Sequence, residues 1–144
     1  MNNNNVLTII VPCYNEEAVL PETVKELTAI LQGLIDAKKV AANSKILFVN
    51  DGSKDKTWSL ISKYSADNEL VTGLKFSRNY GHQNALLAGM SVAVKYSDMM
   101  ITIDADLQDD VNAIPKMVEK YHEGYDVVYG VRNSRKTDTF FKRR

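Results

Sequence analysis

Two aspartates separated by one residue, Asp104 and Asp106, are the strongest candidates for chemistry in this sequence. They follow the apolar run Met99–Ile103, which places them at the end of a predicted buried strand. Carboxylates with this spacing can both turn toward one cation, and Mg²⁺ or Mn²⁺ favours oxygen ligands. Such an ion neutralises the charge that builds on a diphosphate leaving group. An isolated Asp-x-Asp more often caps a turn, but Leu107–Asp110 extends the polar cluster, so we favour a metal site.

Three further polar clusters each follow a short apolar run. Asn15-Glu16, Asn50-Asp51-Gly52-Ser53 and Ser77-Arg78-Asn79 come after Leu7–Val11, Ile46–Val49 and Val71–Phe76 respectively. In open α/β sheets, ligands bind outside the carboxyl ends of the strands. Four polar clusters at such ends therefore predict one shared site.

Each cluster contains residues that can contact a nucleotide. Tyr14 can lie against a base, while Asn15 and Glu16 can bond to the base or the ribose. Asp51 can accept a hydrogen bond from an imide N–H such as that of uracil. Arg78 can bind a phosphate group through its guanidinium.

The same residues also have ordinary structural explanations. Asn15 can be the N-cap of the following helix, and Asp51-Gly52 can form a turn. Ser53 or Asp55 can then cap the helix that begins near residue 57, and Arg78 can pair with a nearby carboxylate. The sequence alone leaves these alternatives open.

The alternation of strands and helices predicts the architecture that holds these clusters. A fifth apolar run, Val127–Val131, follows the other four, and most of these runs are continuous, as in parallel strands covered on both faces. Apolar residues at helical spacing lie between the runs: Val24, Leu27, Ile30/Leu31 and Leu34; Trp58, Leu60 and Ile61; Leu86, Met90, Ala93 and Val94; Ile114, Met117, Val118 and Tyr121. The pattern predicts a three-layer α/β/α domain with a mainly parallel central sheet.

Three single residues inside these elements have structural interpretations. Cys13 is the one cysteine, which excludes an internal disulfide, and its apolar surroundings indicate a buried core residue. Gly89 is expected to allow a helix to pack closely on the sheet. A lone histidine at a helix start, such as His82, is more often structural or exposed than catalytic.

Charge is distributed unevenly along a chain whose net charge is zero. Residues 132–144 contain six basic residues and one acidic residue, which leaves 12 basic and 17 acidic residues in residues 1–131. We therefore predict a lead-in without structure at 1–5, a core at 6–131 and a basic tail at 132–144. The tail is either a solvated end or, because it contains Phe140-Phe141, a segment attracted to an anionic membrane surface. Nothing in this balance indicates nucleic acid. No apolar run approaches the roughly 18–20 residues that cross a bilayer, so we expect a cytoplasmic chain.

Taken together, these motifs resemble family 2 glycosyltransferases of the GT-A fold. The similarity runs through Ile9–Glu17, Val49–Thr57, Phe76–His82, Asp104–Asp109 and Tyr125–Gly130. Each motif is weak alone, but five in this order are specific, and the resemblance covers nearly all of residues 6–136. The chain is most similar to the polyprenyl-phosphate branch, which includes bactoprenol glucosyltransferases and dolichol-phosphate mannose synthases.

The resemblance implies roles for individual residues. It implies that Pro12, Tyr14, Glu16 and Asp51 hold the nucleoside and that Gln108 lines the same site. It also implies that Asp104 and Asp106, the candidate catalytic residues, serve the metal and the diphosphate. Asp110 departs from the family, in which proline is common at this place. Family members also continue past this length into an acceptor-binding and membrane-associated segment, so we expect the chain to be a fragment whose parent lies at the cytoplasmic face of the membrane.

The implied reaction transfers a hexosyl group from a nucleotide diphosphate sugar to a polyprenyl phosphate, with inversion. A UDP-sugar is favoured as the donor, and a GDP-sugar is possible. A phosphate monoester has a second pKa of about 6, so it is largely anionic at pH 7 and needs little help from a general base. This fits a sequence in which only Asp106 or Asp109 can be nominated weakly as a base.

Two alternatives stay open at this stage. One is a family 2 enzyme that uses a hydroxyl acceptor in polysaccharide synthesis, and the other is a non-catalytic nucleotide-binding module. The residues after the first strand, Pro12–Asn15, lack the glycine-rich loop of sugar nucleotidyltransferases and of dinucleotide-dependent oxidoreductases. A phosphoacceptor signalling domain would need an acidic pair there, for which Glu16-Glu17 is a poor substitute. We expect the fragment to bind nucleotide with little or no transfer activity.

Overall fold

Strands and helices alternate along most of the chain. The computed structural model describes residues 5–106, 111–123, 125–132 and 137–143, with side chains up to residue 123. The strands are β1 (Leu7–Cys13), β2 (Lys45–Asn50), β3 (Val71–Lys75), β4 (Met99–Thr102), β5 (Tyr125–Arg132) and β6 (Thr137–Arg143). The helices are α1 (Leu20–Asp36), α2 (Thr57–Asp67), α3 (His82–Ala93) and α4 (Ala113–His122).

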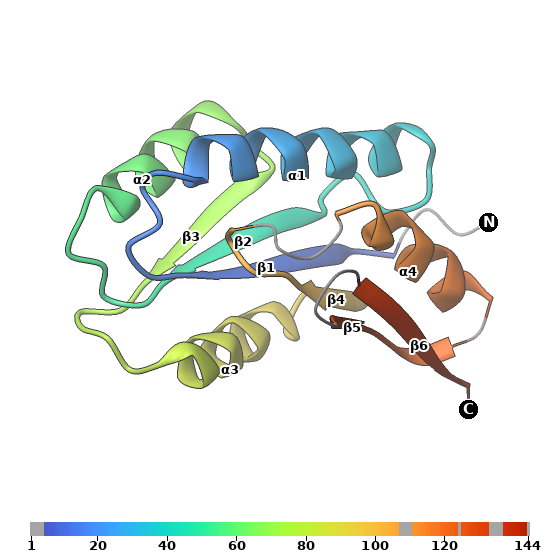
Figure 1. Ribbon diagram of the computed structural model, residues 1–144. Coiled ribbons are helices and arrows are strands. Elements are labelled where there is room, and N and C mark those ends of the chain that lie inside the picture. Colours follow the sequence, from blue (N-terminus) through green and yellow to red (C-terminus); the bar gives the residue numbers. More distant parts are fainter. Residues whose placement is uncertain (1–4, 107–110, 124, 133–136, 144) are drawn as a thin grey trace.

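The first four strands form a parallel sheet in the order β3-β2-β1-β4. β1 lies inside the sheet, and its Ile9 is in register with Ile46 of β2 and Ile101 of β4. Helices α1 and α2 cover one face of the sheet and α3 covers the other (Figure 1). The predicted three-layer α/β architecture with a parallel sheet is therefore confirmed.

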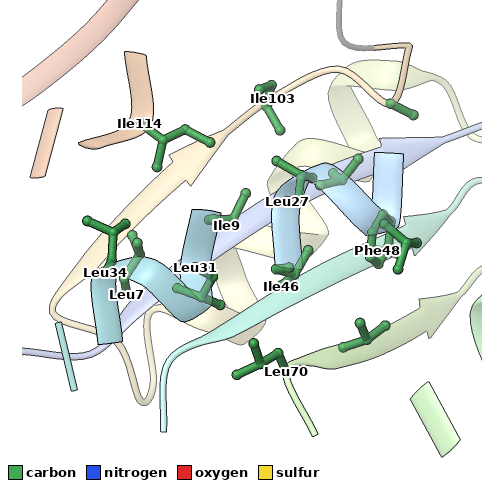
Figure 2. Packing of buried hydrophobic residues seen from close by; sticks show 14 of the residues in the cluster. Leu7, Ile9, Leu27, Leu31, Leu34, Ile46, Phe48, Leu70, Ile103 and Ile114 are labelled. Atoms are coloured by element: carbon green, nitrogen blue, oxygen red, sulfur yellow. The ribbon is translucent and has the colours of Figure 1, made fainter. Parts of the chain in front are cut away.

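The larger core lies between α1 and the sheet. The predicted stripe of α1 is buried at Val24, Leu27, Leu31 and Leu34, and these side chains meet alternate residues of β1 and β2. Figure 2 shows Leu27 and Leu31 beside Ile9 and Ile46. Ile114 and Val118 of α4 join the same core. At roughly 1.5–3 kcal/mol for each fully buried large apolar side chain, this layer is the main stabiliser of the domain.

The opposite face of the sheet is covered at close range by α3. Its buried residues are Ala85, Gly89 and Ala93, spaced four apart on one side of the helix. A Cβ at Gly89 would lie 2.7 Å from a methyl carbon of Ile10, so glycine permits the close approach, as predicted. The predicted apolar stripe was right at Ala93, which is buried, and at Leu86, which packs against this layer, but wrong at Met90 and Val94, which are exposed at 38% and 58%. The fully buried positions of the helix are all small residues.

The C-terminal strands differ from the prediction. Val127–Val131 does form a strand, within β5, but β5 pairs antiparallel with β6 in a separate two-stranded sheet. The residues that we expected to form a basic tail thus contribute β6, whose partner is the preceding strand. Among the described helices, none combines the length and apolar character needed to cross a bilayer.

Candidate functional site

The loop after β1 and the loop after β2 are bonded to each other. The backbone N–H of Asn15 donates to Oγ of Ser53 at 2.9 Å, and the N–H of Lys54 donates to Oδ1 of Asn15 at 2.8 Å. Asn15 has a φ of 53°, a left-handed conformation that asparagine tolerates better than most residues. The N-cap interpretation of Asn15 was wrong, since α1 begins later, at Leu20.

The start of α2 strengthens the same junction. The N–H of Glu16 donates to Oγ1 of Thr57 at 2.8 Å, and Thr57 is fully buried. Asp55 accepts the backbone N–H of Thr57 at 2.9 Å and also its hydroxyl, so it supports the first turn of α2 although Lys56 holds the N-cap position. These bonds fix Glu16 at the edge of the sheet, where its side chain is half-buried.

The loop after β3 is bonded to Asp51. The Asp51 carboxylate accepts the backbone N–H of Tyr80 at 2.8 Å and that of Gly81 at 3.1 Å. Asp51 is only 3% exposed. The guanidinium of Arg78, in the same loop, lies 4.9 Å from the ring centre of Tyr80, and both side chains are exposed. Three loops that follow neighbouring strands are thus joined at one edge of the sheet (Figure 1).

The two candidate metal ligands follow β4 at the same edge. The N–H of Ile103 donates to the carbonyl oxygen of Ile10 at 3.0 Å, which continues the pairing of β4 with β1. Ala105 is buried, and its carbonyl oxygen accepts the hydroxyl of Thr23 from α1. Asp104 is half-buried and Asp106 is exposed, so both carboxylates are accessible.

A histidine from α3 lies beside this pair. Nε2 of His82 is 3.9 Å from Oδ1 of Asp104, and both side chains are about half exposed. His82 is the first residue of α3, and Gly81 before it has a φ of 98°, which glycine alone adopts easily. The loop after β3 therefore reaches the end of β4, and all four predicted polar clusters are connected through these contacts around one edge.

Negative charge accumulates where these loops meet. Burial raises the pKa of Glu16, and the charges of Asp106, Asp104 and Asp55 raise it further. Glu16 is therefore close enough to the three aspartates to be repelled by their charge, and a cation would relieve that repulsion. In the described part of the chain no three His, Cys, Asp or Glu residues come together as a ready-made metal cage. Two carboxylates still fit Mg²⁺ or Mn²⁺, because Mg²⁺ in particular is usually held by one or two carboxylates together with waters and substrate phosphates.

The remaining predicted residues differ in their placement. Pro12 is buried within β1, whereas Tyr14, the first residue after β1, is 41% exposed. Gln108 lies outside the described residues. Cys13 is buried, and this burial, together with the charge of Glu16, strongly raises the pKa of its thiol. The interpretation of Cys13 as a buried core residue is confirmed.

Two residues that hold the site were not found from the sequence. Thr23 lies on the buried side of α1 and bonds to a residue 82 positions away. Tyr80 contributes its backbone N–H to Asp51, a role that no side-chain pattern reveals. A buried threonine inside an apolar helical stripe was the only available signal for Thr23, and that signal does not identify its partner.

Comparison with known proteins identifies the family. The family model described as "Glycosyl transferase family 2" matches residues 8–144. The chain belongs to glycosyltransferase family 2. It is 60% identical over 138 residues to the uncharacterized glycosyltransferase YkoT of Bacillus subtilis (strain 168), covering 96% of this chain and 41% of that protein. It is 38% identical over 141 residues to the prophage bactoprenol glucosyl transferase homolog of Escherichia coli (strain K12), covering 96% and 42%.

Solved structures support the architecture. The mannosyltransferase PcManGT from Pyrobaculum calidifontis, in complex with GDP-Man and Mn²⁺, matches with a TM-score of 0.59 at 23% identity, over 72% of this chain and 28% of that one. Staphylococcus aureus TarS 1-349 in complex with UDP-GlcNAc matches with a TM-score of 0.59 at 20% identity, over 90% and 37%. These likenesses establish the fold. The chain spans about two fifths of the length of the curated relatives that it matches.

Proposed function

We propose that this glycosyltransferase family 2 chain forms the donor-binding part of an enzyme that transfers a hexosyl group from a nucleotide diphosphate sugar to a polyprenyl phosphate, with inversion. The observation that carries the proposal is the convergence of four strand-end loops on the accessible pair Asp104 and Asp106. Relatives named bactoprenol glucosyl transferase and undecaprenyl-phosphate 4-deoxy-4-formamido-L-arabinose transferase, 37–38% identical to this chain, support a polyprenyl phosphate as acceptor.

Different residues at this edge of the sheet would contact different parts of the donor. Tyr14, which is exposed, would lie against the base, and Glu16 would bond to the base or the ribose. The side-chain carbonyl oxygen of Asn15 accepts the backbone N–H of Lys54, so the side-chain NH₂ group of Asn15 is the part that would bind a ligand. Arg78 would bind the diphosphate from the loop after β3.

By resemblance to the family, Pro12 and Asp51 belong to the nucleoside end of the site, and Gln108 lines it. Asp104 and Asp106 would hold Mg²⁺ or Mn²⁺, because their carboxylates are accessible and add to the negative charge around Glu16. When bound, the ion would neutralise the charge of the departing diphosphate. We favour a UDP-sugar, with a GDP-sugar as the alternative donor.

The acceptor explains why a dedicated base is dispensable. A lipid phosphate monoester is already largely anionic at pH 7, since its second pKa is about 6. No carboxylate at this edge is therefore required to take a proton from the acceptor. The same acceptor places the active enzyme at a membrane surface, on the cytoplasmic side where nucleotide sugars are used.

Calorimetry with UDP and GDP, with and without Mn²⁺, tests the donor site. We expect Mn²⁺ to strengthen binding of the preferred nucleotide at least tenfold, and Asp104→Asn or Asp106→Asn to remove that gain. Asp67→Asn, at the exposed end of α2, is the matched control and should bind like wild type. If wild type binds neither nucleotide, or if the two site variants keep the full Mn²⁺ effect, the assignment is wrong.

The transfer step has its own test. With UDP-glucose and a polyprenyl phosphate in detergent, we expect the 144-residue chain to transfer little sugar, because it spans only about two fifths of the length of its curated relatives. Robust transfer by this chain alone would contradict that expectation. Transfer to polyprenol in preference to polyprenyl phosphate would contradict the proposed acceptor.

A further inference from the structure

The outer side of α3 carries large apolar side chains. Leu87, Met90 and Val94 lie three and four residues apart and are exposed at 60%, 38% and 58%. Residues with this spacing share one side of a helix, and Val94 is the C-cap of α3. The side that packs on the sheet has small residues at every fully buried position. The helix therefore turns a row of bulky apolar side chains away from the core.

Exposed apolar side chains are concentrated around this helix. Of the eight large apolar side chains that are exposed in the described part of the chain, six lie between residues 80 and 96. The other two, Tyr14 and Val19, belong to the loop after β1. The exposed positions of α1 and α2 carry no large apolar side chain. Single apolar residues are ordinary on a protein surface, but a continuous row marks a surface that binds a partner.

The charge of this region is opposite to that of the rest of the domain. Residues 76–97 contain Arg78 and Lys95 and no acidic residue. The rest of residues 1–131 keeps 10 of the 12 basic residues and all 17 acidic residues. Arg78 precedes α3 and Lys95 follows it, and both side chains are exposed. An apolar surface flanked by positive charge is complementary to a partner that is both apolar and anionic.

Two kinds of partner present an extended apolar surface, a second copy of this chain and a lipid bilayer. In a symmetric dimer the same face of each copy meets the other, so Arg78 and Lys95 would approach their own counterparts. Residues 76–97 offer no carboxylate to pair with them. An anionic bilayer instead provides phosphates for the basic residues and acyl chains for the apolar ones. Tyr80 and Tyr96, before and after the helix and each 45% exposed, suit the boundary between these two layers.

The position of α3 connects this face to the proposed donor site. His82 is the first residue of α3, and its Nε2 lies 3.9 Å from Oδ1 of Asp104. In Figure 1 the helix runs along the face of the sheet that α1 and α2 leave uncovered. A surface bound to the outer side of α3 therefore lies close to the edge where the strand-end loops meet.

We propose that the outer face of α3 docks on an anionic lipid surface, with Leu87, Met90 and Val94 among the acyl chains, and so brings the donor site to a membrane-held acceptor. The proposal deepens the function proposed above and rests on it for the acceptor. Docking itself needs no nucleotide, so it can be measured separately from the donor site.

Co-sedimentation with vesicles measures docking directly. We expect the chain to bind vesicles of equal parts phosphatidylcholine and phosphatidylglycerol, and to bind phosphatidylcholine alone about tenfold more weakly or less. Leu87→Gln combined with Met90→Gln should weaken binding to the anionic vesicles by about tenfold or more, because it removes apolar area while glutamine still favours a helix. Val19→Gln is the matched control, since it removes an exposed apolar side chain elsewhere, and it should bind like wild type.

The electrostatic part of docking has its own variant. Lys95→Gln should weaken binding to the anionic vesicles by about fivefold, which corresponds to the ~1 kcal/mol contributed by one basic residue near such a surface. It should leave binding to phosphatidylcholine alone unchanged within twofold.

A fluorescent label reports which side of the domain meets the lipid. Cys13 is buried, so a cysteine introduced at an exposed position takes the label selectively. An environment-sensitive dye on Met90→Cys should shift its emission to the blue when anionic vesicles are added. The same dye on Ala29→Cys, at an exposed position of α1, should show no shift.

Several outcomes would overturn the proposal. Wild type that does not bind the anionic vesicles would do so, as would unchanged binding by the double variant of Leu87 and Met90, or equal dye shifts at positions 29 and 90. A dimer in light scattering that the double variant converts to a monomer would assign the face to a second copy instead.

Calorimetry with UDP and Mn²⁺ separates this proposal from the proposed function. In the absence of lipid the double variant should bind nucleotide like wild type, which shows that the fold and the donor site are intact. If it does not, Lys95→Gln and the dye measurements decide whether α3 docks. If wild type binds no nucleotide, the proposed function fails, and vesicle binding still decides the role of α3.

Discussion

Replacement of Gly52 by alanine should damage this domain more than its size suggests. The new Cβ would overlap backbone atoms of Arg78 and Asn79, which cannot rotate away as a side-chain end could. The left-handed conformation of Gly52 adds about 1–2 kcal/mol for any residue with a Cβ. Separation of the loops would also weaken at least one bond from the buried Asp51 carboxylate, each worth about 1.5–3 kcal/mol.

These contributions give Gly52→Ala a loss of about 3–5 kcal/mol in the free energy of unfolding. For a domain of this length that corresponds to a fall of about 10 °C in the melting temperature. The assay is thermal and urea unfolding followed by circular dichroism. Gly33→Ala is the matched control. Gly33 is an exposed residue near the C-terminal end of α1, with no atom within 4 Å of a built Cβ, so the substitution should stabilise by about 0.5–1 kcal/mol. A melting temperature for Gly52→Ala within 2 °C of wild type would refute the argument, using the ~2–4 °C per kcal/mol that applies at this size.

Three further predictions concern other contacts. Thr23→Val should lower the free energy of unfolding by about 1–3 kcal/mol and weaken the Mn²⁺ effect on UDP binding, because it leaves the buried Ala105 carbonyl oxygen without its hydroxyl donor. Thr23→Ser keeps the hydroxyl and should retain most of the stability and of the Mn²⁺ effect. The bond from Lys39 lowers the pKa of Glu119 below its ordinary 4.5. Lys39→Gln should therefore lower the free energy of unfolding by less than about 1 kcal/mol at pH 7, and this difference should vanish as the pH falls below 4.5. A difference that persists at low pH would exclude the ion pair as its cause. Cys13 should resist a thiol reagent at pH 8 in the native state and react at once in urea, and fast native labelling would contradict its burial.

The strands were predictable because their apolar runs are continuous. The run Ile46–Val49 became β2 with its ends extended by one residue, and α1 was recognised from an apolar stripe that is buried as expected. The pattern was only partly right for α3, whose fully buried positions are small residues. Hydrophobicity marks a large core well, but it does not show where two backbones approach closely enough to exclude leucine and methionine.

The position of the site in the fold was predictable, but most of the contacts between its residues were not. Strand-end polarity indicated which loops meet, because carboxyl ends of parallel strands share one edge of a sheet. It did not indicate that Asp51 bonds to the backbone of residues 80–81, since backbone donors have no signature in a sequence. The sequence predicted β5 as a strand but did not predict its partner. That partner is β6, which contains Phe140-Phe141 and lies within the segment predicted to be a basic tail.

The strand order has a consequence for how the protein is made. β1 is the first strand to be synthesised, yet it lies between β2 and β4, and the contact of Val6 with Asp98 spans 92 residues. A chain emerging from the ribosome can join β1 to β2 early, but one side of β1 stays open until β4 has been translated. Closing so long a loop is slow compared with forming the helices. The loop that carries Asp104 and Asp106 should therefore be the last to reach its place, and nucleotide present during synthesis would have nothing complete to bind until then.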